Sequence, residues 1–225
     1  MILSDESRRK VAEFLLRIKA IQLSPNEPFT WASGRKSPIY CDNRKALSHP
    51  TVRTFIRQLS VEAIENAYGR VDAIAGVATG GIAMGALVAQ ELGVPFIYVR
   101  SKPKEHGLTN AIEGDLTVLS NVVVIEDLIS TGGSSLKAVE ALQEAGVEVK
   151  GLIAIFTYGF DVANRAFEDA QCKWLTLTDY PTMLDQATQE GYLNAEQRTL
   201  LDNWNQDPAA WSEAHIAKIP RRHDD

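Results

Sequence analysis

The sequence is poor in cysteine and in positive charge, and each deficit excludes a class of protein. Its 225 residues include only two cysteines, Cys41 and Cys172, which lie far apart and outside any CxxC pattern. This spacing suggests neither a disulfide framework nor a zinc site. Lysine and arginine total 23 against 29 for aspartate and glutamate, a net charge of −6. A nucleic-acid-binding surface is therefore not expected, and the positive residues must cluster if an anion is to bind.

Long hydrophobic runs are also absent. No apolar segment approaches the roughly 18 residues that a membrane-spanning helix requires. The first three residues run straight into Ser4-Asp5-Glu6, so no signal peptide is recognised. With 45% hydrophobic residues, we expect one domain over 1–225, without membrane contact and located in the cytoplasm.

The most informative stretch is 121–135, which reads NVVVIEDLISTGGSS. An apolar, β-branched run from Val122 ends at two acids, which predicts a buried strand of a parallel sheet that leaves the core at Glu126 and Asp127. Two glycines among hydroxyl side chains follow, and then a helical pattern over 136–145. Glycines let backbone N–H groups converge, and a helix N-terminus adds partial positive charge, so this turn can hold a phosphate.

The two acids narrow the choice of ligand. Carboxylates beside a phosphate would repel it unless they face ribose hydroxyls or a bridging Mg²⁺, so a sugar phosphate fits better than a bare phosphate. The stretch contains neither the GxxxxGK[ST] of a P-loop nor the GxGxxG of a dinucleotide site. A tight turn with solvent-facing acids is the alternative without function. We favour a ligand site because binding sites of parallel sheets lie at this end of the strands.

The segment VVVIEDLISTGGS resembles the phosphoribosyl diphosphate signature of the type I phosphoribosyltransferases. The resemblance implies that Glu126 and Asp127 hold the ribose hydroxyls and are the candidate protein ligands of Mg²⁺, which is expected to bind mainly through the substrate. It also gives Asp127 a catalytic role. The residues of this segment that the resemblance assigns to 5-phosphoribosyl 1-diphosphate are Glu126, Asp127, Leu128, Ile129, Ser130, Thr131, Gly132, Gly133 and Ser134.

A second strand, glycine turn and helix come earlier in the chain. We expect a strand over 71–77, a turn at Ala78-Thr79-Gly80-Gly81 and a helix over 82–92. Two such turns at neighbouring strand ends can hold two phosphate groups, and the resemblance places Thr79 and Gly80 against the diphosphate. The alternative is that these glycines only permit tight packing of the helix on the sheet.

The segment 29–42, FTWASGRKSPIYCD, predicts a hairpin with its turn at Gly34. Such a hairpin brings Trp31, Arg35, Lys36 and Tyr40 together as a flap over a flat anionic ring, or else forms only a basic turn with buried aromatics.

This segment is similar to the N-terminal hood of orotate phosphoribosyltransferases. Lys36 and Tyr40, together with Ser130, are therefore candidates for binding orotate. Ala32 stands where some members carry a lysine that touches ligand, so we assign it no role, and Lys36 or Arg35 is a candidate substitute.

The clearest basic cluster is Arg100-Ser101-Lys102-Pro103-Lys104-Glu105-His106-Gly107. With Gly107 and Gly114 as hinges, we expect this segment to move and to close over ligand, although a charge run can also be only a solvated face. The cluster resembles the catalytic loop of orotate phosphoribosyltransferases. The resemblance implies that Arg100, Lys102, Lys104 and His106 bind the diphosphate, and that all but Lys102 are catalytic. It further implies a homodimer whose active sites are shared through the 100–116 loop.

Strand and helix patterns alternate over 71–178, which predicts an α/β fold with a doubly wound, mainly parallel twisted sheet flanked by helices. The remaining expected elements are helices beginning after Ser4 and over 48–68, strands over 95–99, 149–158 and 173–178, and helical structure over 184–211. The resemblance adds the type I phosphoribosyltransferase fold, with an N-terminal helix and hood over 1–47 and a C-terminal helical extension over 179–225. Within that extension, Trp204 and Trp211 are expected to be packing anchors.

The reaction that the resemblance implies is transfer of ribose 5-phosphate to orotate, with Mg²⁺, in pyrimidine nucleotide synthesis. Some members of the family grip the orotate carboxylate with an arginine after the strand at 149–158, where this chain has Tyr158-Gly159. A purine or uracil phosphoribosyltransferase would share 121–135 but has no evident need for the hood or the basic loop. A regulator that senses the same ligand and binds nucleic acid is disfavoured by the net charge.

Overall fold

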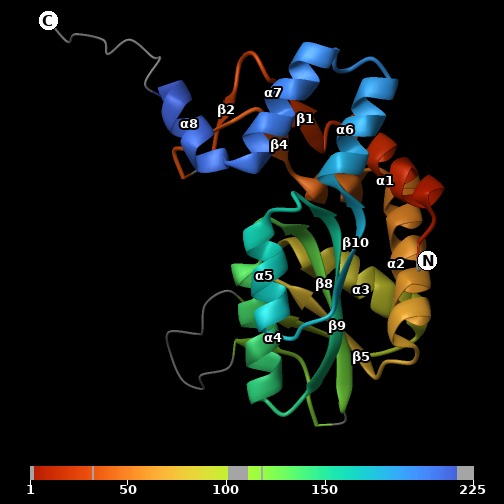
Figure 1. Cartoon of the computed structure of the whole chain (residues 1–225). Helices are drawn as coiled ribbons and strands as arrows, with labels where there is room; N and C mark the ends of the chain where they lie inside the picture. Colours follow the sequence, from red (N-terminus) through yellow and green to blue (C-terminus); the bar gives the residue numbers. More distant parts are fainter. Residues whose placement is uncertain (1–2, 32, 101–110, 118, 217–225) are drawn as a thin grey trace, which may run out of the picture.

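The computed structural model describes residues 3–31, 33–100, 111–117 and 119–216 (Figure 1). Within these residues the central sheet has six strands in the order β10-β9-β8-β5-β6-β7. They are β5 (Ala73–Val77), β6 (Phe96–Val99), β7 (Ile112–Glu113), β8 (Asn121–Ile129), β9 (Glu148–Thr157) and β10 (Trp174–Asp179). The α-helices are α1 (Asp5–Arg17), α2 (Pro50–Tyr68), α3 (Gly80–Leu92), α4 (Gly133–Glu144), α5 (Asp161–Asp169), α6 (Tyr180–Gln189), α7 (Ala195–Gln206) and α8 (Pro208–Ile216), and a 3-10 helix, η1, spans Asn43–Ser48.

The predicted mainly parallel sheet is confirmed. Neighbouring strands pair in parallel from β10 to β6, and only β7 is antiparallel to its neighbour, β6. The strand β7 is a correction, because the sequence predicted an irregular segment over 100–116. All parallel strands end at the same edge of the sheet. The loops that follow β5 and β8 are therefore neighbours, and they lie at the topological switch point, where the strand order reverses.

Strand β8 differs from the prediction in length. It was expected to leave the core at Glu126 and Asp127, but it continues to Ile129. The reason is the partner strand, since β9 pairs with β8 as far as Thr157 opposite Ile129. The acids therefore lie inside the ladder, where the alternation of a strand fixes which way each one points.

The two faces of β8 pack against different helices. Val122 and Val124 belong to a buried cluster that includes α4 and α5, whereas Val123 and Ile125 belong to the cluster of α1, α2 and α3. Figure 1 shows these helices on opposite sides of the sheet. The sequence did not predict α5.

A group of small elements covers the edge of the sheet where the parallel strands end (Figure 1). We call the pairs β1 (Ile21–Leu23) with β4 (Ile39–Cys41) and β2 (Phe29–Thr30) with β3 (Lys36–Ser37) the hood. The β2–β3 hairpin turns at Gly34, with φ of +82°, as predicted. The pairing of β1 with β4 was missed because a strand of three residues carries little periodic signal.

The C-terminal helices α7 and α8 contact the hood and the end of β9. The backbone N–H of Lys36 donates to Ser212 Oγ of α8 at 2.8 Å, and Asn205 Nδ2 of α7 donates to the carbonyl of Tyr158 at 2.8 Å. Trp204 is fully buried among Trp31, Tyr158 and Phe160, which confirms its predicted packing role. The hood, α7 and α8 thus form one covering layer.

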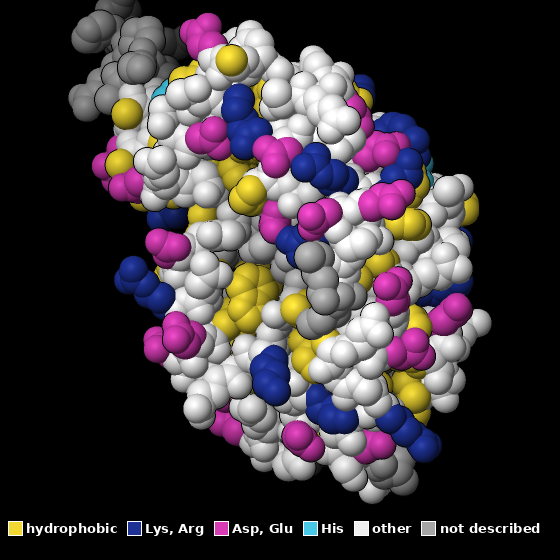
Figure 2. All heavy atoms as spheres, turned by 45° about the vertical axis from the view of Figure 1, so that its right-hand side comes forward, with side chains coloured by type: hydrophobic (Ala, Val, Ile, Leu, Met, Phe, Trp, Pro, Cys, Tyr) yellow, Lys and Arg dark blue, Asp and Glu magenta, His cyan; other side chains and the backbone are white. Residues whose placement is uncertain are grey.

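The cysteines, the helices and the surface charges can be examined in the described residues. Cys41 and Cys172 are both free, as predicted. None of the helices in the described ranges combines the length and the hydropathy needed to cross a membrane. On the face in Figure 2, lysine and arginine side chains are interspersed with acidic ones rather than gathered in a stripe.

Candidate active site

The turn after β8 is built for close approach to an anion. We call residues 130–134 the phosphate loop; they lead from the end of β8 into the first turn of α4. Gly132 has φ of +82°, and a Cβ there would lie 2.8 Å from the Phe167 ring, so only glycine fits. Thr131, Gly133 and Ser134 are exposed, which leaves hydroxyls and backbone groups at a helix N-terminus open to a ligand.

Leu128 and Ile129, which the resemblance assigned to the same ligand, lie inside β8. The Ile129 side chain is fully buried, and its carbonyl accepts hydrogen bonds from Tyr158 N and Thr157 Oγ1. Leu128 is half-buried and packs against the core. These two residues position the loop that follows them.

The two acids have different surroundings. Glu126 is only 4% exposed, and its carboxylate accepts hydrogen bonds from Ser135 Oγ at 2.9 Å and from the Asp127 backbone N–H at 3.0 Å. Burial, aided by the neighbouring Asp127 carboxylate, raises the pKa of Glu126 to about 8. Asp127 is half-buried. Of the two carboxylates, Asp127 is therefore the one more accessible to a ligand.

The turn after β5, residues 78–81, which we call the second glycine loop, lies directly against Asp127. A Cβ on Gly80 would overlap the carboxylate of Asp127, and a Cβ on Gly81 would overlap the carbonyl of Ile125. Thr79, beside them, is exposed. The predicted neighbourhood of the two loops is confirmed, and glycine is favoured at position 80 because the backbone there touches the carboxylate of Asp127 on β8.

The hood is joined to the same acid. Asn43, just after β4, is buried, and its Nδ2 donates to the backbone carbonyl of Asp127 at 2.7 Å. The Oδ1 of the same amide accepts from the Cys41 thiol at 3.3 Å, and burial raises the pKa of that thiol, which keeps it a donor. The cover and the sheet are therefore connected at the acid pair.

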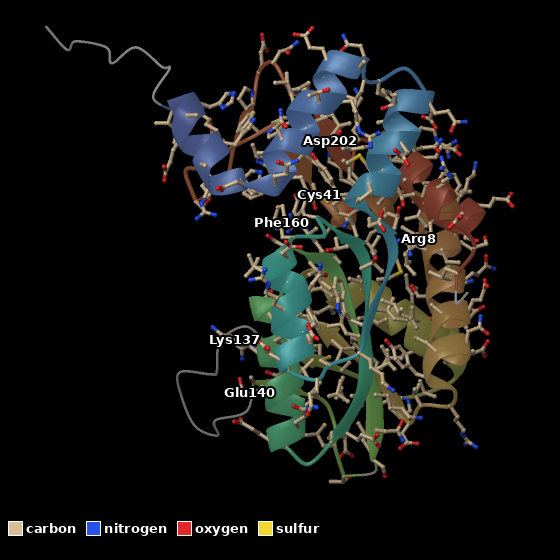
Figure 3. All side chains as sticks on the ribbon, viewed as in Figure 1. Arg8, Cys41, Lys137, Glu140, Phe160 and Asp202 are labelled. Atoms are coloured by element: carbon tan, nitrogen blue, oxygen red, sulfur yellow. The ribbon has the colours of Figure 1, made fainter. Side chains whose placement is uncertain are left out.

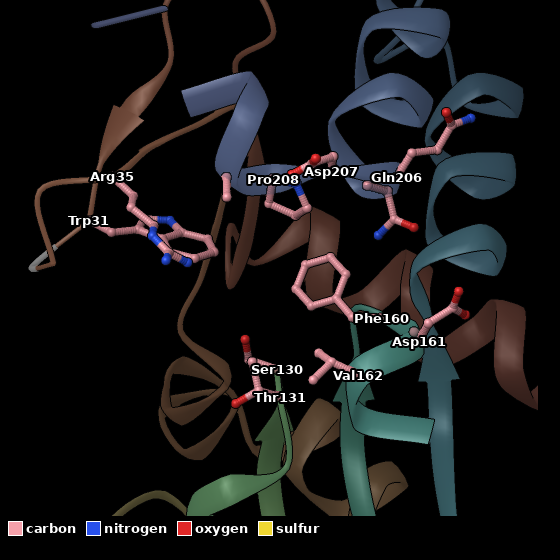
Figure 4. Close-up of a pocket in the computed structure, with 13 residues that line it drawn as sticks. Trp31, Arg35, Ser130, Thr131, Phe160, Asp161, Val162, Gln206, Asp207 and Pro208 are labelled. Atoms are coloured by element: carbon pink, nitrogen blue, oxygen red, sulfur yellow. The ribbon is translucent and has the colours of Figure 1, made fainter. Parts of the chain in front are cut away.

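A cavity of about 440 Å³ lies between the hood, the phosphate loop and the C-terminal helices (Figure 4). It is lined by Trp31, Arg35, Ser130, Thr131, Gly159, Phe160, Asp161, Val162, Asn205, Gln206, Asp207, Pro208 and Ala209. The structure thus brings Ser130 and the hood residues Trp31 and Arg35 to one space. It is large enough for a small flat ring.

Two predicted orotate contacts do not line this cavity. Lys36 directs its Nζ to Thr30 Oγ1 at 2.8 Å, and the exposed Tyr40 ring packs beside Phe29 at a centroid distance of 5.8 Å. The lining from α5, α7 and α8 was not foreseen as part of a site. No local pattern marks it, because these residues reach the cavity only through long-range packing of the C-terminal helices.

Of the basic segment, the structure describes Arg100. Its Nη1 lies 3.4 Å from Glu113 Oε1 on β7, and its backbone N–H donates to the carbonyl of Ala111 at 2.7 Å. Arg100 and Ala111 are therefore hydrogen-bonded neighbours beside β6 and β7. Lys102, Lys104 and His106 lie outside the described residues, as does Ala32.

Comparison with known proteins identifies relatives over most of the chain. The model of the phosphoribosyl transferase domain matches residues 45–183. Orotate phosphoribosyltransferase of Phocaeicola vulgatus is 60% identical over 200 residues, covering 89% of this chain and 94% of that protein. The enzyme of the same name from Porphyromonas gingivalis is 56% identical over 201 residues, covering 89% and 96%.

Solved structures agree with this match. Orotate phosphoribosyltransferase from Aeropyrum pernix superposes with a TM-score of 0.71 at 28% identity, covering 82% of this chain and 99% of that one. UMP synthase of Leishmania donovani gives a TM-score of 0.74 at 23% identity over 89% of this chain and 42% of that longer protein. The second likeness concerns the fold alone.

The contact between Gly80 and Asp127 gives a test. Gly80→Ala should lower the free energy of unfolding by about 1–3 kcal/mol, because the added methyl group collides with the carboxylate. This loss should outweigh the gain of up to about 1 kcal/mol that alanine normally brings to a helix. Urea unfolding measures the difference. Ala83→Ser, at an exposed position of α3, is the matched control and should change stability little. Equal stability of the two variants would contradict the contact.

The buried Glu126 predicts a dependence of stability on pH. Its ordinary pKa is 4.5 and its folded value about 8, so between these pH values the folded protein holds a proton that the unfolded chain has lost. The stability that this bound proton gives the folded state is fully present below pH 4.5 and is lost as pH rises through 8. Glu126→Gln lacks it, so from pH 5 to pH 9 the variant should gain about 4 kcal/mol relative to the parent.

Urea unfolding at pH 5, 7 and 9 measures this gain. Glu140→Gln is the control, since Glu140 lies on α4 and points away from the sheet (Figure 3). A constant difference between Glu126→Gln and the parent across these pH values would refute the raised pKa.

Proposed function

This chain belongs to the phosphoribosyl transferase family, and on that premise we propose that it is an orotate phosphoribosyltransferase. As such it transfers ribose 5-phosphate from 5-phosphoribosyl 1-diphosphate to N1 of orotate, giving orotidine 5'-phosphate and diphosphate. The reaction is a pentosyl transfer of pyrimidine nucleotide synthesis. The identity of 56–60% to proteins of that name, over nearly their whole length, is the observation that carries the proposal.

The geometry of the described residues supports the same reaction. One edge of the sheet holds the phosphate loop, the exposed part of the second glycine loop and the accessible Asp127. The cavity begins at Ser130 of the phosphate loop. A ligand with a phosphate, a ribose and a second phosphate group can extend from one loop to the other. The base would then lie in the cavity under the hood.

The chemistry requires stabilisation of a leaving group rather than a strong base. The bond between the anomeric carbon and the diphosphate oxygen breaks with its electron pair on the diphosphate, and the new bond forms from N1 of orotate. The sugar passes through an oxocarbenium-like state, in which fixed charges act without reorganising. The proton of N1 leaves to solvent or to a nearby carboxylate.

We assign roles to this chain's residues accordingly. Asp127 holds the ribose hydroxyls and is the acid nearest to the reacting centre, while Glu126 keeps Ser135 and the strand end in place and is the second acid of the pair. Arg100, Lys102, Lys104 and His106 bind the diphosphate, and Lys104 with Arg100 carries most of the stabilisation as negative charge grows there. His106 donates a hydrogen bond or a proton, since an ordinary histidine pKa near 6.5 makes both forms available.

Mg²⁺ fits the donors that are present. Asp127 offers an accessible carboxylate, whereas both oxygens of Glu126 already accept hydrogen bonds. The described part of the chain holds no group of three His, Cys, Asp or Glu side chains placed to bind an ion. The ion would therefore be held mainly by the substrate, with Asp127 and then Glu126 as its protein ligands. When bound, it neutralises charge on the diphosphate.

The proposal includes a cytoplasmic homodimer in which the 100–116 loop of one subunit reaches the active site of the other. The resemblance of the basic cluster to the catalytic loop of the family supports this arrangement. This basic cluster begins at Arg100, directly after β6 at the edge of the parallel part of the sheet.

The loss of orotate absorbance in the presence of 5-phosphoribosyl 1-diphosphate and Mg²⁺ tests the reaction. The parent should turn over, and Asp127→Asn and Lys104→Ala should each lower kcat by about 10²–10³-fold, because each removes a charge that stabilises the transition state. Lys137→Ala is the control, since this exposed lysine of α4 points away from the sheet (Figure 3). Tight binding of the phosphoribosyl donor without turnover of orotate would contradict the proposed base.

Mixing the two inactive variants tests the shared active site. Asp127→Asn and Lys104→Ala subunits, denatured together and refolded, should form mixed dimers with one site that has both residues intact. The activity of the mixture should then exceed the sum of the two variants refolded separately. No recovery, with mixed dimers demonstrated by two different affinity tags, would show that each loop serves its own subunit.

A further inference from the structure

The structure indicates how the substrate's carboxylate is held. Building on the proposed function, we infer that Arg35 of the hood binds the carboxylate of orotate and thereby sets the preference for a 6-carboxylated pyrimidine. A ring that carries a carboxylate binds best where a cation faces the cavity that receives it. The cavity contains a candidate with suitable chemistry.

Among the described residues that line the cavity, Arg35 is the one with a positively charged side chain. The other charged side chains that line it are two carboxylates, Asp161 and Asp207. Figure 4 shows Arg35 and Trp31 across the cavity from Asp161. A substrate carboxylate is repelled from the side of Asp161 and attracted to the side of Arg35. The charges therefore orient an anionic ring as well as hold it.

The backbone at Arg35 is fixed. The Trp31 backbone N–H donates to the carbonyl of Arg35 at 2.9 Å, which closes the hairpin, and the Gly34 N–H donates to the carbonyl of Trp31 at 2.8 Å. The next residue, Lys36, donates its backbone N–H to Ser212 Oγ, and Ser212 is only 2% exposed. The side chain thus stands on a backbone anchored to both the hood and α8.

The Arg35 side chain is available for a ligand. Among the described residues, no carboxylate forms an ion pair with it. Lys36, the neighbouring cation, instead donates its Nζ to Thr30 Oγ1 and does not line the cavity. A guanidinium also suits the task better than an ammonium, because its planar fork can donate two parallel hydrogen bonds to one carboxylate.

The aromatic surroundings provide a surface for the ring. Trp31 is held by a hydrogen bond from its Nε1 to the carbonyl of Ile39 at 3.1 Å and packs beside Trp204 at a centroid distance of 6.1 Å. Phe160, which also lines the cavity, stacks on Tyr158 at 5.3 Å. A flat base can lie against these immobilised rings with its carboxylate toward Arg35.

The test pairs a change in the protein with a change in the ligand. Steady-state kinetics are measured for the parent and Arg35→Gln with orotate and with its neutral 6-carboxamide analogue. Arg35→Gln should raise KM for orotate about 10- to 100-fold, the value of a charge-assisted bidentate contact. KM for 5-phosphoribosyl 1-diphosphate should stay unchanged. The parent should prefer orotate to the carboxamide, and in Arg35→Gln this preference should be lower by the same factor. Arg35→Lys should restore the preference in part.

One control variant and the contrary outcomes make the result decisive. Arg165→Gln removes the same charge from an exposed position of α5 outside the cavity lining and should leave KM for orotate unchanged. An unaltered KM in Arg35→Gln, or a rise that appears in Lys36→Gln instead, would overturn the assignment of Arg35. A parent that fails to use orotate at all would defeat the proposed function rather than this inference, so the two failures are distinguishable.

Discussion

The contact between the backbone of Gly80 and the carboxylate of Asp127 determines how the candidate active site is assembled. It brings the loop after β5 against the strand end of β8, and a Cβ at position 80 would displace the carboxylate. Both strands are parallel neighbours in the sheet, so their carboxyl ends meet at the same edge. The spacing of the two loops therefore follows from strand pairing and from one glycine, rather than from flexible segments that adjust to a ligand.

The sequence was sufficient to predict the parallel strands of the sheet, although not β7, because they are short apolar runs separated by glycine turns and amphipathic helices. The hairpin at Gly34 and the two glycine loops could also be predicted, since each contains residues whose conformational preferences are local. The end of β8 could not be predicted from the run itself. Its length depends on pairing with β9, which is a property of the partner strand and not of the acids.

The cavity was less accessible to prediction for the same reason. Trp31, Arg35 and Ser130 were found from motifs, but the wall from α7 and α8 has no motif, because it depends on where a distant helix packs. Lys36 and Tyr40 illustrate the opposite case. Lys36 follows Arg35 directly and Tyr40 lies on β4 of the same hood, yet Lys36 donates its Nζ to Thr30 Oγ1 and the Tyr40 ring packs beside Phe29.

Because the two faces of β8 pack against different helices, the strand cannot gain or lose a residue without consequence. Val122 and Val124 pack toward α4 and α5, while Val123 and Ile125 pack toward α1, α2 and α3. Deleting or inserting a single residue before Glu126 would exchange the two hydrophobic sets and at the same time rotate Asp127 to the opposite side of the sheet. Core packing and the placement of the acid thus depend on the same strand register. Insertions are therefore tolerable only in the loops on either side of this strand.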